Sequence, residues 1–307
     1  MSCRLPNLFI IGYPKCGTTS LFTYLAAHPD FCGSSKKEPS HFFYHRFDTS
    51  KYDMNFYQSY FARCGSERFV FEASVTHVRG GRPHALFLKE TFEEPKIIVL
   101  LREPTERLYS YYHLCRDNGY IATTMSFEEF LQEGERRRRA GGPLPEGIWR
   151  SYATRYDDHL FDWMDVFGDD MFIGFFEQLK VAPGRLCDAI CDWLDVARLT
   201  AFEVGFEVEN RTINPRSTQL HRVARSFNSA MEPVFRRHLP LKRRLRSAYR
   251  AANARRGGPG RPTPDQQRRL DAMFAPSNAR VAAELRRRRP ELDLPDWLGG
   301  SATAKAG

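Results

Sequence analysis

The sequence predicts a three-layer α/β/α fold built on a central, mainly parallel sheet, and two observations support this prediction. Short, continuous apolar runs typical of buried strands stand at residues 8–12, 68–74, 96–102 and 171–177. Amphipathic stretches typical of helices lie between them, at 19–28, 105–116 and 156–167. Strands that are apolar on both faces and alternate with helices favour a parallel sheet that is covered on both sides.

The chain has 307 residues, which is enough for a substantial core. No internal repeat and no linker with a sharp change of composition interrupts it, so we expect a single domain over residues 1–300 and a disordered tail at 301–307. Two basic segments, 136–147 and 243–264, read as inserted loops.

The charge balance indicates an anionic partner without identifying it. The net charge is +9, from 46 Lys and Arg against 37 Asp and Glu. Nucleic acids, anionic glycans, acidic membranes and phosphate-bearing ligands are all bound through such an excess. Aromatic base-stacking motifs are missing, so no nucleic-acid partner is expected. The oligomeric state stays open.

Seven cysteines form neither a CxxC pair nor a zinc-binding spacing, and we expect no metal site. Their odd number favours a reducing compartment. No apolar run approaches the ~20 residues that a membrane-spanning helix needs. The expected location is the cytoplasm if Met1 is the native start, and the Golgi lumen if the chain is a trimmed lumenal piece.

The stretch FIIGYPKCGTTS follows the first expected strand and opens the first expected helix. Such a turn surrounds a bound anion with backbone N–H groups and the positive end of a helix. Gly12 and Gly17 keep the spacing of a nucleotide-binding P-loop, but Lys15 stands before the second glycine instead of after it. The predicted anion-binding residues are Pro14, Lys15, Cys16, Gly17, Thr18, Thr19 and Ser20.

A second strand-to-helix turn follows the run KIIVLL. Arg102 stands at the end of this strand, Pro104 suits the first turn of a helix, and Ser110 lies about two turns further on. Arginine can bind a phosphate through two parallel hydrogen bonds, and a serine hydroxyl can complete the shell. A ligand with phosphate-type groups at both ends would use both sites. 3′-Phosphoadenosine 5′-phosphosulfate (PAPS), the biological sulfuryl donor, fits that description.

These motifs resemble those of the PAPS-dependent sulfotransferase family. YPKCGTTS is similar to its 5′-phosphosulfate loop, and LLREPTERLYSYY is similar to its 3′-phosphate motif. KKEPSHFF (36–43) resembles a KExHFF-like stretch of the glycan branch, which includes heparan sulfate and chondroitin sulfotransferases. GGPGRPTP (257–264) partly matches a KGRxHP-like loop, through Gly260 and Arg261. The resemblance covers residues 6–298 and implies a P-loop-like α/β fold.

The chain departs from the family pattern at three places. KKEPSHFF has one extra residue between Glu38 and His-Phe-Phe. FEAS places Ala73 where the glycan branch has an EKS-like or EKT-like lysine. Pro259 replaces the lysine of the KGR loop.

The resemblance implies transfer of a sulfuryl group from PAPS to a hydroxyl or amine of an acceptor, expected to be an anionic or neutral glycan. The product would be adenosine 3′,5′-bisphosphate. Lys15 is expected to stabilise the leaving oxygen, so that no metal is required, and Glu38 to act as the general base, with His41 in reserve. Lys37, Glu72, Ser74 and Thr76 are the candidate acceptor contacts.

Three alternatives stay open. The acceptor could be a small alcohol or phenol. The chain could instead be a P-loop kinase or NTPase, which would need a magnesium-binding carboxylate such as Glu72 or Glu177. It could also be a non-catalytic protein that binds polyanions.

Overall fold

The computed structural model describes residues 4–42, 53–140, 148–202, 205–206, 245 and 260–299. The chain forms two compact units. One contains residues 1–107, 154–210 and 271–307, and the other contains 108–153 and 211–270. Each is described by itself below. The expected single domain over 1–300 stays a prediction, and the tail at 301–307 lies outside the described residues.

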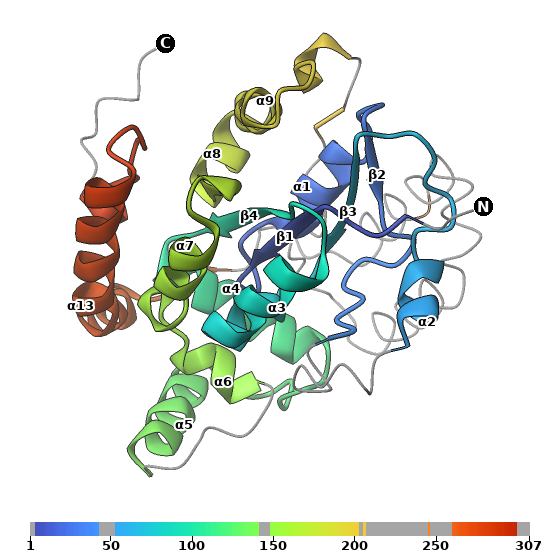
Figure 1. Ribbon diagram of the computed structural model, residues 1–307. Coiled ribbons are helices and arrows are strands. Elements are labelled where there is room, and N and C mark those ends of the chain that lie inside the picture. The colour runs from blue at the N-terminus through green and yellow to red at the C-terminus, as the bar shows by residue number, and fades with distance from the viewer. Residues whose placement is uncertain are drawn as a thin grey trace. The chain divides into compact units, whose positions relative to one another are not determined.

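The first unit is built on a five-stranded parallel sheet (Figure 1). Its strands run in the order β2-β3-β1-β4-β5, so β1 lies at the centre. The register pairs Ile10 of β1 with Ala73 of β3 on one side and with Ile98 of β4 on the other. The strands are β1 (Leu8–Gly12), β2 (Phe31–Gly33), β3 (Phe69–Ala73), β4 (Lys96–Leu101) and β5 (Met171–Phe175).

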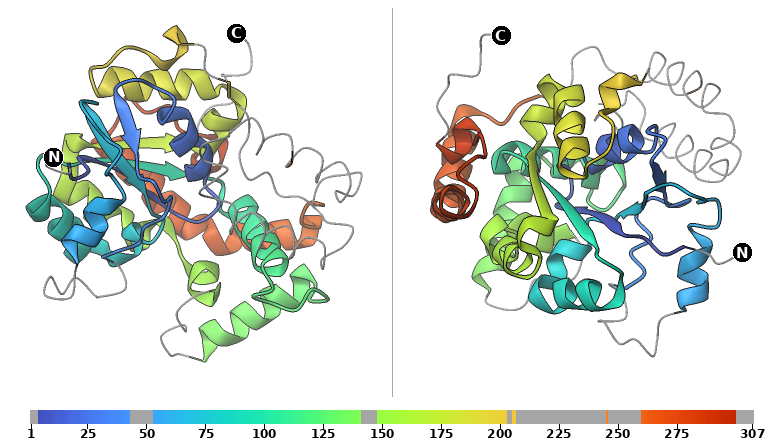
Figure 2. Two further views of the ribbon diagram at one scale, coloured as in Figure 1. Left: turned by 90° about the vertical axis from the view of Figure 1, so that its right-hand side faces the viewer. Right: turned by 45° about the horizontal axis from the view of Figure 1, so that its top comes forward.

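Helices cover both faces of this sheet, which confirms the predicted three-layer arrangement. Figure 1 shows α1, α8 and α9 over one face and α3 and α7 over the other, and Figure 2 shows the strands side by side from two further directions. The helices of this unit are α1 (Thr18–Leu25), α2 (Met54–Ser59), α3 (Gly81–Thr91), α7 (Leu160–Phe167), α8 (Phe176–Val181) and α9 (Pro183–Trp193), with short 3₁₀ turns at η2 (His77–Gly80), η3 (Tyr156–Asp158), η4 (Gly168–Asp170), η5 (Leu199–Ala201) and η6 (Asp296–Leu298).

All four predicted strands and the first two predicted helices are confirmed within two or three residues at their ends. The predicted helix at 156–167 is divided into η3 and α7 at His159, whose φ of −143° is not helical. The three-residue strand β2 was missed because FCG is too short to show a pattern.

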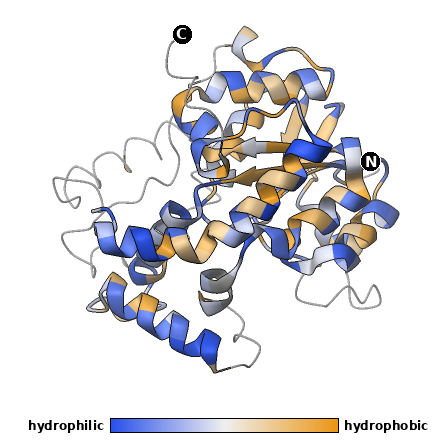
Figure 3. Ribbon diagram, turned by 90° about the vertical axis from the view of Figure 1, so that its left-hand side faces the viewer, coloured by the Kyte–Doolittle hydropathy of each residue, from blue (hydrophilic) through white to orange (hydrophobic). Residues whose placement is uncertain are grey.

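The strands are buried because both faces of the sheet are covered. Every residue of β1 and β3 is buried, which is why these strands are apolar almost throughout instead of alternating. The central strands are orange, for hydrophobic, in Figure 3. One polar side chain, Glu72, is nevertheless enclosed in β3 with no exposed surface.

The second unit contains α5 (Phe127–Arg139) and α6 (Ile148–Ala153), together with most of α4 (Pro104–Asp117) and the start of α13 (Pro264–Arg288). Ser126 and Glu129 form a capping box that begins α5. At its end, Glu133 and Glu135 pair with the four successive arginines 136–139. Hydrogen bonds from these arginines lower the pKa of both glutamates to about 2. This part of the expected inserted loop at 136–147 is therefore helical and internally paired.

A disulfide joins Cys32 at the middle of β2 to Cys64, which follows α2. Stable disulfides are typical of oxidising compartments. The bond therefore contradicts the expectation of a reducing compartment. The expected cytoplasmic location, which was conditional on Met1 as the native start, is not supported. Sequence spacing alone could not indicate this pair, since Cys32 and Cys64 lie 32 residues apart with five other cysteines in the chain.

Among the described residues, no helix combines the length and the apolar character needed to cross a bilayer.

We expect the Cys32→Ser/Cys64→Ser double variant to unfold at lower denaturant concentration than the parent chain. Opening a cross-link across a 32-residue separation costs about 3–4 kcal/mol in the chain-entropy model. Urea unfolding followed by circular dichroism measures this difference. A reductant should destabilise the parent chain and leave the double variant unchanged; equal sensitivity of the two would contradict the assignment.

Candidate functional site

The candidate site lies where three neighbouring strands of the first unit end. Because β3, β1 and β4 are parallel and adjacent, their carboxyl ends meet at one edge of the sheet. Ligands of parallel α/β sheets bind at this edge. The segments that leave it are the loop 12–17 after β1, Ser74 after β3 and Arg102 after β4.

The loop after β1 has an unusual backbone. Gly12, Lys15 and Gly17 have φ angles of 147°, 74° and 90°. Lysine is uncommon in this region, where its Cβ is crowded, so the position of Lys15 is set by the loop and not by its own preference. Gly17 is required twice over, because a Cβ there would lie 2.6 Å from Leu179 and 2.9 Å from Phe176.

Helix α1 begins directly after this loop. Its N-cap is Gly17, which has no side chain to cap the first turn. Thr18 and Ser20 are buried on this turn, whereas Thr19 is partly exposed. The first backbone N–H groups and the positive end of the helix are thus combined with three hydroxyls, as an anion site requires.

The structure brings Arg102 onto the same loop. Its Nη1 donates a hydrogen bond to the carbonyl oxygen of Lys15 at 3.1 Å, and its Nη2 contacts Glu106 at 3.1 Å. The guanidinium lies 4.2 Å from the ring centre of Phe176. Its Nε is buried and has no hydrogen-bond partner among the described residues. The two cations predicted from separate motifs therefore belong to one structural site.

Tyr156 links the loop to Arg102, a role that no sequence motif indicated. Its hydroxyl donates to the carbonyl of Arg102 at 2.5 Å and accepts from the amide of Arg102 at 3.1 Å. Its backbone carbonyl accepts a hydrogen bond from the hydroxyl of Tyr13. The thiol of Cys16 also contacts it, and burial raises the pKa of this thiol to about 11. Cys16 is thus a neutral packing group at neutral pH.

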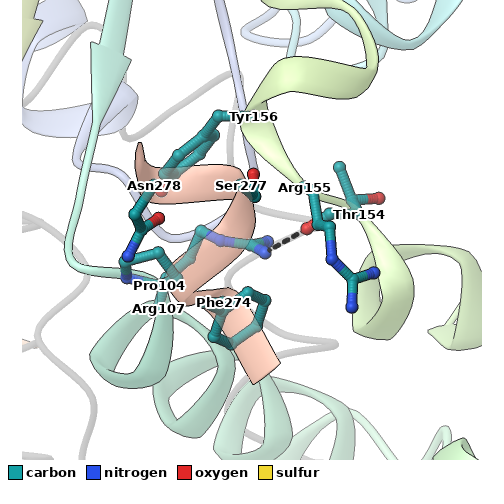
Figure 4. Close-up of a pocket in the computed structure, with 8 residues that line it drawn as sticks. All are labelled: Pro104, Arg107, Thr154, Arg155, Tyr156, Phe274, Ser277 and Asn278. Atoms are coloured by element: carbon teal, nitrogen blue, oxygen red, sulfur yellow. Dashed lines mark hydrogen bonds between the residues drawn. The ribbon is translucent and has the colours of Figure 1, made fainter. Parts of the chain in front are cut away.

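Arg107 is a second residue that the sequence did not single out. Its side chain is 1% exposed, and its Nη2 donates to the carbonyl of Thr154 at 2.8 Å (Figure 4). The guanidinium also faces the rings of Tyr156 and Tyr13, at 5.6 and 6.0 Å. It lines a narrow pocket together with Pro104, Thr154, Arg155, Tyr156, Phe274, Ser277 and Asn278. Arg107 therefore supports the aromatic pair that lies behind the loop.

Glu38, the predicted base, lies on a tight turn with φ of 60°. Its amide donates to the carbonyl of Ala73 at the end of β3, at 2.9 Å. Its carboxylate is 42% exposed and pairs with Nζ of Lys37 at 2.7 Å. The base candidate is thus accessible, while its backbone is fixed to the strand beside β1.

His41, the predicted reserve base, packs among aromatic rings. It stacks on Tyr57 at 5.3 Å between ring centres and contacts Phe42 edge to face. These contacts assign it a packing role in this structure, and its catalytic role stays a prediction.

Two of the predicted acceptor contacts, Glu72 and Ser74, have no exposed surface. The hydroxyl of Ser74 donates to Glu72 at 2.5 Å. Thr76 is partly exposed and donates to the hydroxyl of Ser40 at 3.2 Å. Glu72 and Ser74 are hydrogen-bonded to each other in the interior of the protein. They therefore do not form a surface that an acceptor could contact.

The remaining predicted residues lie in the second unit. Ser110 is on α4, and Arg261 is exposed just before α13. Gly260 lies against Tyr109, whose hydroxyl would be 3.4 Å from a Cβ at this position. Pro259 lies outside the described residues.

Three comparisons with known proteins agree on one family. The family model described as "Sulfotransferase domain" matches residues 5–237. The solved sulfotransferase from Alicyclobacillus acidocaldarius is similar over 96% of this chain and 99% of that chain, with a TM-score of 0.64 and 25% sequence identity.

Curated relatives match more distantly. The bifunctional heparan sulfate N-deacetylase/N-sulfotransferase 1 of Caenorhabditis briggsae is 24% identical over 312 residues, which cover 97% of this chain and 32% of the relative. The membrane-associated sulfotransferase kil1 of Dictyostelium discoideum is 33% identical over 134 residues, covering 42% of this chain and 28% of the relative. This chain thus spans less than a third of the length of these relatives.

The packing of Gly17 predicts a large effect of a single methyl group. Gly17→Ala should lower the free energy of unfolding by about 2–4 kcal/mol, because it combines a left-handed backbone with overpacking against Leu179 and Phe176. Gly119→Ala is the matched control: its φ is 72°, and no atom lies within 4 Å of the added Cβ. It should cost only about 1–2 kcal/mol. Equal losses in urea unfolding would contradict the packing argument.

Proposed function

The chain belongs to the sulfotransferase domain family, and we propose that it transfers a sulfuryl group from PAPS to a hydroxyl or amine of a carbohydrate. One observation carries the proposal: Lys15 and Arg102, from two neighbouring strands, meet on a glycine-bounded loop that begins a helix. Such an arrangement suits a doubly anionic ligand.

The residues present fit a phosphosulfate group. The first turn of α1 has no side-chain cap, and the Nε of Arg102 is buried without a partner among the described residues. The absence of a Cβ at Gly17 also permits the close packing of the loop on α8. We assign the 5′ end of the donor to 14–20 and its 3′-phosphate to Arg102. Ser110, Gly260 and Arg261 keep the 3′-phosphate role that the sequence predicts for them.

PAPS supplies the sulfuryl group and leaves as adenosine 3′,5′-bisphosphate. In this proposal Lys15 stabilises the negative charge that grows on the leaving oxygen, which is the role of a metal ion in many kinases. The left-handed backbone at Lys15 sets the direction in which its side chain leaves the loop. The proposal therefore predicts that activity persists when EDTA removes free metal ions.

Glu38 accepts the proton of the acceptor group. Its carboxylate is both accessible and fixed through its backbone, which a general base needs. Nζ of Lys37 pairs with this carboxylate at 2.7 Å. His41 is the second candidate for this role, although its ring stacks on Tyr57.

The acceptor is proposed to be a carbohydrate because the heparan sulfate N-deacetylase/N-sulfotransferase named above is among the relatives. Lys37 and the partly exposed Thr76 are the proposed acceptor contacts. Ala73 stands where the glycan branch has a lysine. In this chain Lys37, which directly precedes Glu38, is the proposed cation beside the acceptor. A panel of de-N-sulfated heparin, unsulfated chondroitin and 2-naphthol separates amine, sugar hydroxyl and phenol acceptors.

Lys15→Ala should reduce turnover of labelled PAPS by about 100- to 1,000-fold, the usual effect of removing one group that stabilises transition-state charge. Lys180→Ala is the matched control, because it removes the same charge from an exposed position on α8. Loss of sulfate transfer in both variants, or in neither, would contradict the role of Lys15. Magnesium-dependent turnover of ATP by the parent chain would overturn the proposed function itself.

Glu38→Gln should reduce turnover by about 100- to 10,000-fold, the range of general-base catalysis. Stabilisation against heat by adenosine 3′,5′-bisphosphate should survive, because the donor site does not include this carboxylate. Glu94→Gln is the control, since Glu94 also has a positive φ (42°) but lies in the turn before β4. Full activity of Glu38→Gln would pass the role to His41.

A further inference from the structure

A buried carboxylate lies directly behind the turn that carries Glu38. Glu72 accepts hydrogen bonds from the hydroxyl of Tyr57 at 2.8 Å, from Nε2 of His77 at 2.9 Å and from the hydroxyl of Ser74 at 2.5 Å. Burial alone would raise the pKa of Glu72, but His77 and these three hydrogen bonds outweigh it and lower the pKa. The side chain is therefore a fully enclosed, hydrogen-bonded carboxylate.

Buried rings close the side of the cluster that lies away from Ser74. Nδ1 of His77 contacts Nε2 of His84 at 3.0 Å, and both rings are fully buried. Burial lowers the pKa of His84 well below its ordinary value. The ring of His84 lies beside Trp163, at 5.9 Å between centres. The cluster is thus closed on this side by packed rings, and its polar connection to the surface runs through Ser74.

Ser74 joins three parts of the site. Its amide donates to the carbonyl of Ile10 in β1 at 3.2 Å. Its hydroxyl has a single hydrogen, which is given to Glu72, so the oxygen can accept the hydrogen bond that the amide of Ser40 donates at 3.2 Å. Donation to a carboxylate makes the hydroxyl oxygen a better acceptor. Ser74 therefore links the strand that leads to Lys15 with the turn that presents Glu38.

The turn needs this support. Glu38 and Ser40 both have positive φ angles, 60° and 51°. This conformation is unfavourable for a residue that carries a side chain, because its Cβ is crowded. Two hydrogen bonds from the end of β3 oppose this cost: Glu38 N to Ala73 O and Ser40 N to Ser74 Oγ. Without the second bond, the turn is free to relax and move the carboxylate of Glu38.

We propose that Ser74, backed by the buried carboxylate of Glu72, is a positioning residue that holds Glu38 where it can take the acceptor proton. Ser74 does not touch the acceptor in this role. The inference rests on the proposed function, since it takes Glu38 as the base.

A double-mutant cycle tests the proposal. Ser74→Ala should lower kcat by about 10- to 100-fold, because small displacements of a reacting group cost about that much. The KM for PAPS and the affinity for adenosine 3′,5′-bisphosphate should stay within about twofold. In the Glu38→Gln background the same substitution should have no further effect on kcat, because the group it positions is gone. Rates are measured with the best acceptor of the panel, or as release of inorganic sulfate to water.

Ser277→Ala is the matched control for stability. Ser277 is also a buried serine whose hydroxyl donates to a carboxylate, that of Asp157. It should destabilise the chain to a similar degree and leave kcat unchanged.

The outcomes separate the two proposals. Equal factors for Ser74→Ala in the parent and Glu38→Gln backgrounds indicate a merely structural role and overturn the inference, as does an unchanged kcat in the single variant. If Glu38→Gln itself keeps full kcat, the assignment of the base fails, and the positioning of Glu38 fails with it. If Glu38→Gln is inactive and Ser74→Ala is not, only the inference fails.

Discussion

The parallel pairing of β1 between β3 and β4 is the constraint on which the site depends. Each strand contributes only one or two functional groups at its carboxyl end, and none of these groups is close to another in the sequence. The register fixes their separation, because a slip of the hydrogen-bond ladder by one residue would move every core side chain to the opposite face of the sheet. The core therefore sets the positions of Lys15, Arg102 and Ser74, and the hydrogen bond from Arg102 to Lys15 adds to this placement.

The sequence predicted those parts of the fold and site that are encoded locally. Continuous apolar runs predicted four of the five strands, and the glycine pattern with Lys15 and Arg102 predicted the loop that the structure builds. Tyr156 and Arg107 could not be found in the same way, because their roles come from contacts with residues 54 and 47 positions away in the sequence. The burial of Glu72 could not be predicted either. A carboxylate near the end of a strand is expected on the surface, and only the three hydrogen bonds in the structure explain why this one is enclosed.

The positive net charge is less informative than the placement of single cations. The run of four arginines on α5 is neutralised by Glu133 and Glu135. Arginines at the end of α13 pair with Glu284 and Asp165, and Arg289, which follows α13, pairs with Asp169. Such pairs stabilise helices slightly and contribute little to a distant field. Arg102 also pairs with Glu106, but its side chain is only 14% exposed and it also donates to the backbone of the loop. Local geometry, and not the total charge, distinguishes a candidate anion site from a solvated surface.

The bond between Cys32 and Cys64 encloses the whole segment that carries Lys37, Glu38 and His41. Strand β2 holds the start of this segment in the sheet, and the disulfide fixes the end of the segment to that strand. The oxidation state of the two cysteines therefore limits how far the turn that carries Glu38 can move. Protein folded where thiols stay reduced would share the same sequence and donor loop but present its carboxylate less consistently. Specific activity would then vary between preparations with the fraction of oxidised chains. A free-thiol assay would therefore be needed beside the protein concentration to compare preparations.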